Sequence, residues 1–298
     1  MNRKVKKSGG PVTYYRSIRA REFSVKMDYH KEYRKVHGYL PIIDDTAICQ
    51  HIKFSLLTLN DGEVHEGKTG GNEACLVILG GRCNVEVGGQ KWKDIGRRRN
   101  VFDGKPTSIY IPKDSPFRVE AQGEMDAGLC MAPASESREP SLIPPEDVKC
   151  RAVGSWNWTR TVCDIMGNDS EIPQTLIVGE TINPPGNWSS SPPHKHDVDD
   201  LPRESKLEEV YFYKLKPSQG FALQRIYTGD GELNESYVIK DGDTVAFPRG
   251  YHPVVAAPGY QLYYLWVLAG EKRIMRPNDD PDHAWVKDTE PIISDIIG

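Results

Sequence analysis

Two of the eight histidines, His194 and His196, lie one residue apart in the stretch SPPHKHD. Alternate residues of a β-strand point to the same face, about 7 Å apart along the backbone, so both imidazoles can approach one ion. Such a pair is weak evidence by itself, but Glu209 follows in EVYFYKL and His252 lies in the turn PRGYHP. Three neutral imidazoles and one carboxylate form a common site for a divalent metal ion. The sequence therefore predicts one such centre, with zinc or manganese expected first and iron or nickel as alternatives.

The carboxylate ligand could be supplied by Glu208 or by Glu209, because adjacent residues of a strand face opposite sides. If Glu209 points inward, Tyr211 and Tyr213 join it in the polar interior, and the hydrophobic residues between them pack against a neighbouring layer. This register separates polar from apolar side chains, so it favours Glu209.

Short runs of β-branched and aromatic residues, separated by many of the 27 glycines and 22 prolines, recur along the chain. Closely spaced strands of this kind predict an all-β sandwich or barrel. Residues 28–38 are the best candidate for a helix, and a short one. The expected strands are 74–81, 83–89, 107–112, 117–121, 175–182, 209–215, 221–228, 236–242, 243–248, 252–257 and 260–270.

The two halves of the chain look alike. Glu73 precedes ACLVIL as Glu209 precedes VYFYKL, and DGKPTSIYIPKDSPFRV parallels DGDTVAFPRGYHPVV. An internal repeat of this kind predicts two barrels in tandem. We expect a flexible basic N-terminus at 1–20, a first barrel at 21–147 and a second at 148–298, with 131–147 as a linker or strap. In this alignment Pro116 takes the place of His252, so we expect a metal site in the second barrel only.

Length and composition narrow the class of protein. The 298 residues carry a net charge of −4 and are 38% hydrophobic, which gives no reason to expect a nucleic-acid partner. Neither a signal peptide nor a run of about 18 apolar residues is present, so we expect a cytoplasmic protein without a membrane partner. None of the six cysteines forms a C-x-x-C pair, and we expect buried, reduced thiols.

The site residues carry a resemblance to known families. The spacing of Gly242, Pro248, Gly250 and His252 resembles the second cupin motif, and the H-x-H pair with its later glutamate resembles the first. The second half, from SSPPHKHD through ESKLEEVYFYKLKPSQGFALQRIYT and VIKDGDTVAFPRGYHPVVAAPGYQLYYLWVLAG to NDDPDHAW, is similar to the 5-deoxy-glucuronate isomerases of myo-inositol catabolism. EACLVILGG extends the match into the first half. The resemblance implies a bicupin, two tandem jelly-roll barrels, related to 4-deoxy-L-threo-5-hexosulose-uronate ketol-isomerase. The segment 96–106 departs from the pattern, and we expect it to be a barrel loop.

The resemblance implies an aldose–ketose isomerisation of 5-deoxy-D-glucuronate to 5-dehydro-2-deoxy-D-gluconate. A Lewis-acid metal would polarise the carbonyl oxygen and stabilise the enediolate. The proton carrier stays open among a metal-bound water and four tyrosines, Tyr211, Tyr213, Tyr227 and Tyr264.

The carboxylate of a sugar acid requires a basic side chain as its partner, and the planar guanidinium of arginine can donate two parallel hydrogen bonds to it. We expect Arg225 first, because its strand should run through the barrel, with Tyr227 on the same face. Arg249, beside the turn of His252, and Lys195, between the two histidines, are the alternatives. A regular strand would turn Lys195 away from the metal.

Other functions share the same ligand set. The uronate ketol-isomerase would act on a different sugar acid, and a cupin dioxygenase would use iron or copper and consume oxygen. A non-catalytic module would bind metal or sugar acid without turnover. The sequence is also compatible with a homo-oligomer.

Overall fold

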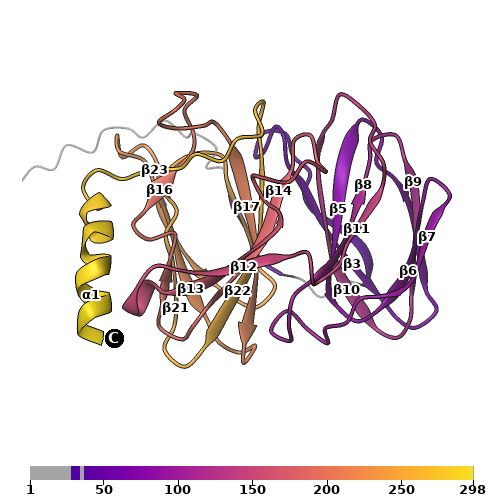
Figure 1. Cartoon of the computed structure of the whole chain (residues 1–298), viewed down its shortest axis with the longest axis horizontal. Coiled ribbons are helices and arrows are strands. Elements are labelled where there is room, and N and C mark those ends of the chain that lie inside the picture. The colour runs from indigo at the N-terminus through magenta and orange to yellow at the C-terminus, as the bar shows by residue number, and fades with distance from the viewer. Residues whose placement is uncertain (1–27, 34–36, 298) are drawn as a thin grey trace, which may run out of the picture.

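A computed structural model describes residues 28–33 and 37–297, and its strands form two barrels that lie side by side (Figure 1). The first barrel pairs a six-stranded sheet with a four-stranded sheet. In spatial order, the larger sheet contains β11 (Ser141–Ile143), β8 (Thr107–Ile111), β5 (Asn72–Gly80), β10 (Met125–Pro133), β3 (Lys53–Leu59) and β2 (Gly38–Ile43). The smaller contains β4 (Val64–Lys68), β9 (Pro116–Ala121), β6 (Cys83–Val87) and β7 (Gln90–Ile95).

The second barrel is built from three sheets. The seven-stranded sheet contains β1 (His30–Lys31), β20 (Thr244–Phe247), β17 (Glu208–Lys216), β22 (Gln261–Ala269), β14 (Ile177–Asn183), β13 (Arg160–Met166) and β12 (Lys149–Val153). A four-stranded sheet contains β15 (Trp188–Ser189), β21 (Val254–Ala256), β18 (Ala222–Tyr227) and β19 (Asn234–Ile239), and β16 (His194–Lys195) pairs with β23 (Asn278–Asp279). The all-β class predicted from the sequence is confirmed.

Helices are short and peripheral in the described part of the chain. They are η1 (Trp156–Trp158), η2 (Ala284–Thr289) and α1 (Glu290–Ile297), and α1 lies at the outer end of the second barrel (Figure 1). No helix among the described residues is long and apolar enough to cross a membrane.

The central strands of the large sheets are buried on both faces, and the described residues form three hydrophobic cores. One core fills each barrel, and the third lies between the two large sheets. Alternation along β17 sends Val210 and Phe212 into the core between the barrels and Tyr211 and Tyr213 into the second barrel. Because both faces are covered, these strands read as continuous apolar runs in the sequence.

Two glutamates join the barrels in a nearly symmetrical way. The carboxylate of Glu73 on β5 accepts hydrogen bonds of 2.7 to 2.8 Å from the backbone N–H groups of residues 174, 175 and 176, just before β14. The carboxylate of Glu208 on β17 accepts two bonds of 2.8 Å from Gln50 and His51, shortly before β3. Glu73 therefore corresponds to Glu208, and the sequence alignment that paired it with Glu209 is wrong by one residue.

A buried ion pair also links the barrels, and it uses the middle residue of the arginine run 97–99. Nη1 of Arg98 donates to both carboxylate oxygens of Glu180 on β14 at 3.0 Å, and Nε donates to the carbonyl of Ile78 at 3.1 Å. The hydroxyl of Tyr263 also donates to Glu180 at 3.0 Å. Burial raises the pKa of Glu180, and the charge of Arg98 opposes that effect. The predicted loop 96–106, which lies between β7 and β8, therefore supplies a contact between the barrels.

Several segments have a structure that differs from the one predicted from the sequence. The helix expected at 28–38 is wrong, because residues 30–31 form β1 and pair with β20 of the second barrel, while residues 34–36 lie outside the described part. Asp243 holds this segment in place, since its carboxylate lies 2.9 Å from Nε2 of His30 and accepts the N–H of Tyr33 at 2.9 Å. The expected flexible N-terminus, 1–20, lies outside the described residues. Within 131–147, residues 141–143 form β11 and pair with β8 at the edge of the first barrel.

The expectation that all six cysteines are reduced is wrong for one pair. Cys150 on β12 and Cys163 on β13 are direct partners in the antiparallel register, with Cα atoms 4.0 Å apart, and they form a disulfide. This pairing depends on the register between two strands, which the cysteine spacing alone does not specify. The other four cysteines are free and buried.

We expect Arg98→Met to destabilise the protein by about 3–5 kcal/mol, because the Glu180 carboxylate would stay buried without its partner. Arg99→Met is the matched control, since the adjacent Arg99 is 86% exposed and pairs with Asp103 in solvent. It should leave the free energy of unfolding nearly unchanged. Urea denaturation of both variants measures the difference, and equal stability of the two would contradict the structural role of the ion pair.

Candidate metal centre

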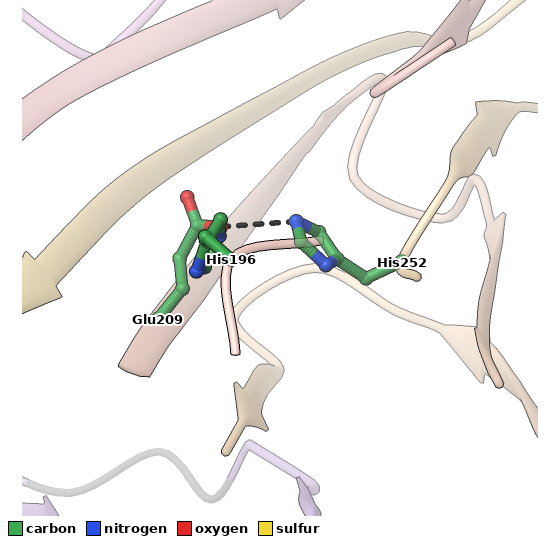
Figure 2. A group of neighbouring side chains, drawn as sticks. All are labelled: His196, Glu209 and His252. Atoms are coloured by element: carbon green, nitrogen blue, oxygen red, sulfur yellow. Dashed lines mark hydrogen bonds and ion pairs between the residues drawn. The ribbon is translucent and has the colours of Figure 1, made fainter. Parts of the chain in front are cut away.

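Three of the four predicted ligands converge in the second barrel. His196 follows β16, Glu209 lies on β17 and His252 precedes β21, and their ligand atoms all lie within 4.8 Å of one another. Oε2 of Glu209 is 2.9 Å from Nε2 of His196 and 3.0 Å from Nε2 of His252. Figure 2 shows the glutamate directed toward His252, with the ring of His196 beside its carboxylate. All three side chains are buried.

Backbone carbonyls fix the orientation of both rings. Nδ1 of His196 lies 2.8 Å from the carbonyl oxygen of Leu207, and Nδ1 of His252 lies 2.9 Å from that of Gly250. A carbonyl oxygen can only accept, so each Nδ1 carries a proton and donates it. In the neutral rings, Nε2 then presents a lone pair to the centre, which is the arrangement that histidine ligands of metals adopt.

The charge of this cluster favours the binding of a cation. Burial alone would raise the pKa of Glu209, but the adjacent rings of His196 and His252 lower it to about 2, so the carboxylate is ionised at neutral pH. Nε2 of His252 is buried and makes no hydrogen bond with the described residues. Burial lowers the pKa of His196, but its hydrogen bond to Glu209 outweighs that effect and raises it, so positive charge beside the carboxylate is favoured. A divalent ion would supply that charge in place of a ring proton and would leave the Nε2 lone pairs free to coordinate. A divalent ion fits this donor set.

The fourth predicted ligand, His194, lies beside the group of three. Its ring centroid is 5.1 Å from that of His252 and 6.3 Å from that of His196, and no atom of it belongs to the 4.8 Å cluster. Burial lowers the pKa of His194 well below its usual value, and the charges of His252 and His196 lower it further. The ring is therefore neutral and can coordinate, and it faces a cavity next to the cluster.

An ion-pair network behind the histidines holds their loop. Nζ of Lys195 donates to Asp197 and, at 2.7 and 2.9 Å, to the carboxylate oxygens of Glu204. Glu204 also accepts the backbone N–H groups of residues 197 and 198, and Asp197 accepts that of Gly250 in the turn before His252. Lys195 thus positions the loop, and it does not line the cavity as a predicted substrate-binding residue should.

A cavity of about 360 Å³, called the centre cavity here, opens beside the cluster. The hydroxyl of Tyr211 lies 3.1 Å from that of Ser190, and Tyr264 forms a hydrogen bond with Ser189. Burial raises the pKa of Tyr211 well above its usual value and also raises that of Tyr264, so both phenols keep their protons at neutral pH. Residues that line the centre cavity include Arg160, Thr181, Ser189, Ser190, His194, Glu209, Tyr211, Tyr264 and Trp266.

Two of the four candidate tyrosines lie outside the lining of the centre cavity. Tyr213 shares the inner face with Tyr211, but its hydroxyl donates to Gln224 at 2.7 Å deep in the barrel. The hydroxyl of Tyr227 donates to Asp280 at 2.6 Å. Neither tyrosine lines the centre cavity, so the predicted catalytic role of Tyr227 has no support in the geometry.

The two arginines predicted to bind the substrate carboxylate, Arg225 and Arg249, also lie outside the lining of the centre cavity. Arg225 and Tyr227 do share one face, since the guanidinium lies 3.8 Å from the ring centroid, but Arg225 is exposed on the outside of the barrel. The inward position belongs to Gln224, whose amide donates to the backbone carbonyl of His252 at 2.8 Å. Arg249 is exposed and pairs with Glu232. The expectation that Arg225 faces the cavity is therefore wrong.

The sequence reasoning missed several residues of the centre cavity. Ser189 and Ser190 precede the histidine pair in NWSSSPPHKH, so a search for hydroxyls near the ligands could have found them. Arg160 stands alone in WNWTRTVCD, with no local signal. A larger cavity, of about 520 Å³, includes Glu208 and Arg249 in its lining but none of the four candidate ligands.

Comparison with known proteins identifies relatives along most of the chain. The family model of the KduI/IolB family matches residues 26–286. The 5-deoxy-glucuronate isomerase of Geobacillus kaustophilus is 42% identical over 242 residues, which cover 81% of this chain and 87% of that enzyme. The 5-deoxy-glucuronate isomerase of Listeria monocytogenes is 40% identical over 238 residues, or 79% of this chain and 87% of the relative.

Solved structures show the same architecture. The crystal structure of an IolB-like protein from Salmonella typhimurium superposes with a TM-score of 0.85 at 31% identity, covering 88% of this chain and all of that one. An oxalate decarboxylase of Lactobacillus farciminis superposes with a TM-score of 0.60 at 12% identity, over 86% of this chain and 89% of the other. The second likeness concerns the fold alone, and together the two support the predicted bicupin architecture.

We expect the purified protein to carry one divalent ion per chain, bound in the second barrel. Glu209→Gln should remove most of this metal, because only Glu209 faces the imidazoles. Glu208→Gln is the matched control, since that carboxylate faces the first barrel, and it should retain the ion. Elemental analysis by mass spectrometry measures both variants, and a larger loss in Glu208→Gln would contradict the assignment.

Proposed function

Because the chain belongs to the KduI/IolB family, we propose that it is a 5-deoxy-glucuronate isomerase that works at the candidate metal centre. The observation that carries this proposal is the name shared by relatives 40–42% identical to this chain, each aligned over 87% of its length. The centre cavity supports it, because a small polar chamber lined by hydroxyls suits a sugar acid.

The reaction moves a hydrogen between two neighbouring carbons. In 5-deoxy-D-glucuronate the aldehyde is C1, and C2 carries a hydroxyl and the hydrogen to be removed. The product, 5-dehydro-2-deoxy-D-gluconate, has its ketone at the former C2 and a hydroxymethyl group at the former C1. The difficulty is the low acidity of the C2–H bond, which falls only if the negative charge that develops on oxygen is stabilised.

His196, Glu209 and His252 would hold the ion, with His194 as the fourth ligand at the edge of the centre cavity. A divalent ion in this position supplies Lewis acidity toward the substrate oxygens. One carboxylate and three neutral imidazoles leave the net charge of such a centre positive. The carbonyls of Leu207 and Gly250 keep both buried rings in the tautomer that coordinates through Nε2.

The proton requires carriers within reach of both carbons, and Tyr211 and Tyr264 are the tyrosines that line the centre cavity. Both phenols are protonated at neutral pH, so each can donate a hydrogen bond or a proton to a substrate oxygen. Their serine partners, Ser190 and Ser189, fix the position of each hydroxyl. The two residues share the donor role in this proposal, and water remains the alternative carrier.

The ketol-isomerase reaction on the pectin-derived uronate is the second candidate, because the sequence resemblance implies a relation to that enzyme. It would use the same centre and differ in the sugar acid. A cupin dioxygenase would need oxygen for turnover, and a binding module would release its ligand unchanged.

We expect anaerobic turnover of 5-deoxy-D-glucuronate with a higher kcat/KM than that of 4-deoxy-L-threo-5-hexosulose-uronate. Removal of the metal with a chelator should abolish turnover, and addition of zinc or manganese should restore it. Product formation followed by NMR measures each case. A requirement for oxygen, or a preference for the second substrate, would contradict the proposal.

We expect Tyr211→Phe or Tyr264→Phe to lower kcat by roughly 10²–10⁴-fold, the range of a lost general acid or base. Tyr227→Phe is the control, because its hydroxyl bonds to Asp280 away from the centre cavity and its loss should change kcat little. Steady-state kinetics should be combined with metal content, so that a lost ion is not mistaken for a lost proton donor. Normal kcat in both cavity variants would assign the proton to water.

A further inference from the structure

Three basic side chains line the centre cavity, and two of them are already neutralised. Arg151 on β12 pairs with Asp164 on the neighbouring strand, and Lys287 in η2 pairs with Asp279. Arg160, at the start of β13, forms no ion pair with any described residue. The centre cavity therefore contains one uncompensated cation among the described side chains.

The face of β13 explains why Arg160 points into this space. Residues 160, 162 and 164 of the strand all line the centre cavity. Cys163 and Ile165, on the opposite face, belong to the core between the barrels. Alternation along the strand thus fixes the direction of Arg160.

The guanidinium of Arg160 is anchored through Nη1 and has no partner among the described residues at Nε or Nη2. Nη1 donates to the backbone carbonyl of Trp158 at 3.1 Å. Nε is buried and has no hydrogen-bond partner, and no bond from Nη2 to a described residue is present either. These two nitrogens form one edge of the planar group, and such an edge binds a carboxylate with two parallel hydrogen bonds. Because a buried donor without a partner costs stability, this edge favours a ligand.

The charge of Arg160 acts on the same space as the candidate centre. It contributes to lowering the pKa of His194, after burial and the neighbouring rings, and it opposes the increase that burial causes in the pKa of Tyr264. The cation thus lies near enough to influence groups at the candidate metal ligands and at the hydroxyls. A ligand that spans the centre cavity can contact the ion at one end and Arg160 at the other.

We propose that the Nε and Nη2 edge of Arg160 binds the carboxylate of the sugar acid, while its other end lies at the metal centre. The identity of the ligand as a sugar acid rests on the proposed function, whereas the carboxylate site rests on the geometry of Arg160. Four carbons separate the carboxylate carbon from the aldehyde carbon in 5-deoxy-D-glucuronate. Binding of the remote charge would position C1 and C2 for reaction.

Kinetics on Arg160→Met and Arg160→Lys provide the first measurement, with Arg225→Met as the matched control. Arg160→Met should lower kcat/KM for 5-deoxy-D-glucuronate by roughly 100-fold, as expected for lost charged hydrogen bonds, with a higher KM and a lower kcat. Arg160→Lys keeps the charge but loses the fork, so it should recover part of the loss. Arg225→Met should resemble the wild type, because Arg225 is exposed outside the barrel. Metal content should be normal in all three variants.

Binding of two inert polyols to the metal-loaded protein separates the carboxylate site from the reaction. Calorimetry should show that Arg160→Met weakens D-gluconate at least 10-fold and leaves the neutral D-glucitol unchanged, while Arg225→Met alters neither. Unchanged gluconate binding, or an equal loss for both polyols, would overturn the proposal. If the wild type fails to isomerise 5-deoxy-D-glucuronate but gluconate still depends on Arg160, the proposed function fails and the carboxylate site stands. If the wild type isomerises 5-deoxy-D-glucuronate and Arg160→Met does so equally well, the proposed function stands and the carboxylate site fails.

Discussion

The alternation of side chains along β17 is the constraint on which the rest of the structure depends. Val210 and Phe212 pack between the barrels, and the residues between them face the interior of the second barrel. At the head of the same strand, Glu208 binds the backbone of the first barrel, and Glu209 meets the two histidines. A shift of one residue would bury the wrong carboxylate in each place, so packing of the barrels and formation of the centre require the same register.

The repeat explains why the described residues contain a candidate centre in one barrel only. Both barrels keep the glutamate that binds the other barrel, at Glu73 and Glu208. One residue further along, the second barrel has Glu209, whereas the first has the buried Ala74. The carboxylate that binds the other barrel is thus present in both halves, as Glu73 and Glu208. The carboxylate that faces the interior of a barrel at the next position is present only in the second, as Glu209. The first barrel contributes instead to the core between the sheets and to the ion pair of Arg98 with Glu180.

Charge in the second barrel is distributed so that few groups stay without a partner. Lys195 is neutralised behind the histidine loop, and the two other cations at the centre cavity are paired with aspartates. What remains among the described residues is the carboxylate of Glu209 beside two imidazoles and, in the lining of the same cavity, Arg160, whose Nε has no hydrogen-bond partner. The candidate centre is complementary to a metal ion, and Arg160, the cation at the centre cavity that has no ion pair among the described residues, is complementary to an anionic ligand.

The sequence by itself determined the all-β class, the internal repeat, and the preference for Glu209 over its neighbour, because strand parity is a local property that hydrophobic residues reveal. It also predicted that Arg225 and Tyr227 share a face, but it could not tell which face of β18 is the inner one. That choice belongs to the pairing of β18 with β19 and β21, which turns Gln224 inward. The disulfide of Cys150 with Cys163 and the position of Arg160 likewise depend on neighbouring strands. Contacts between residues far apart in the chain are set by sheet register, and only the tertiary structure contains that information.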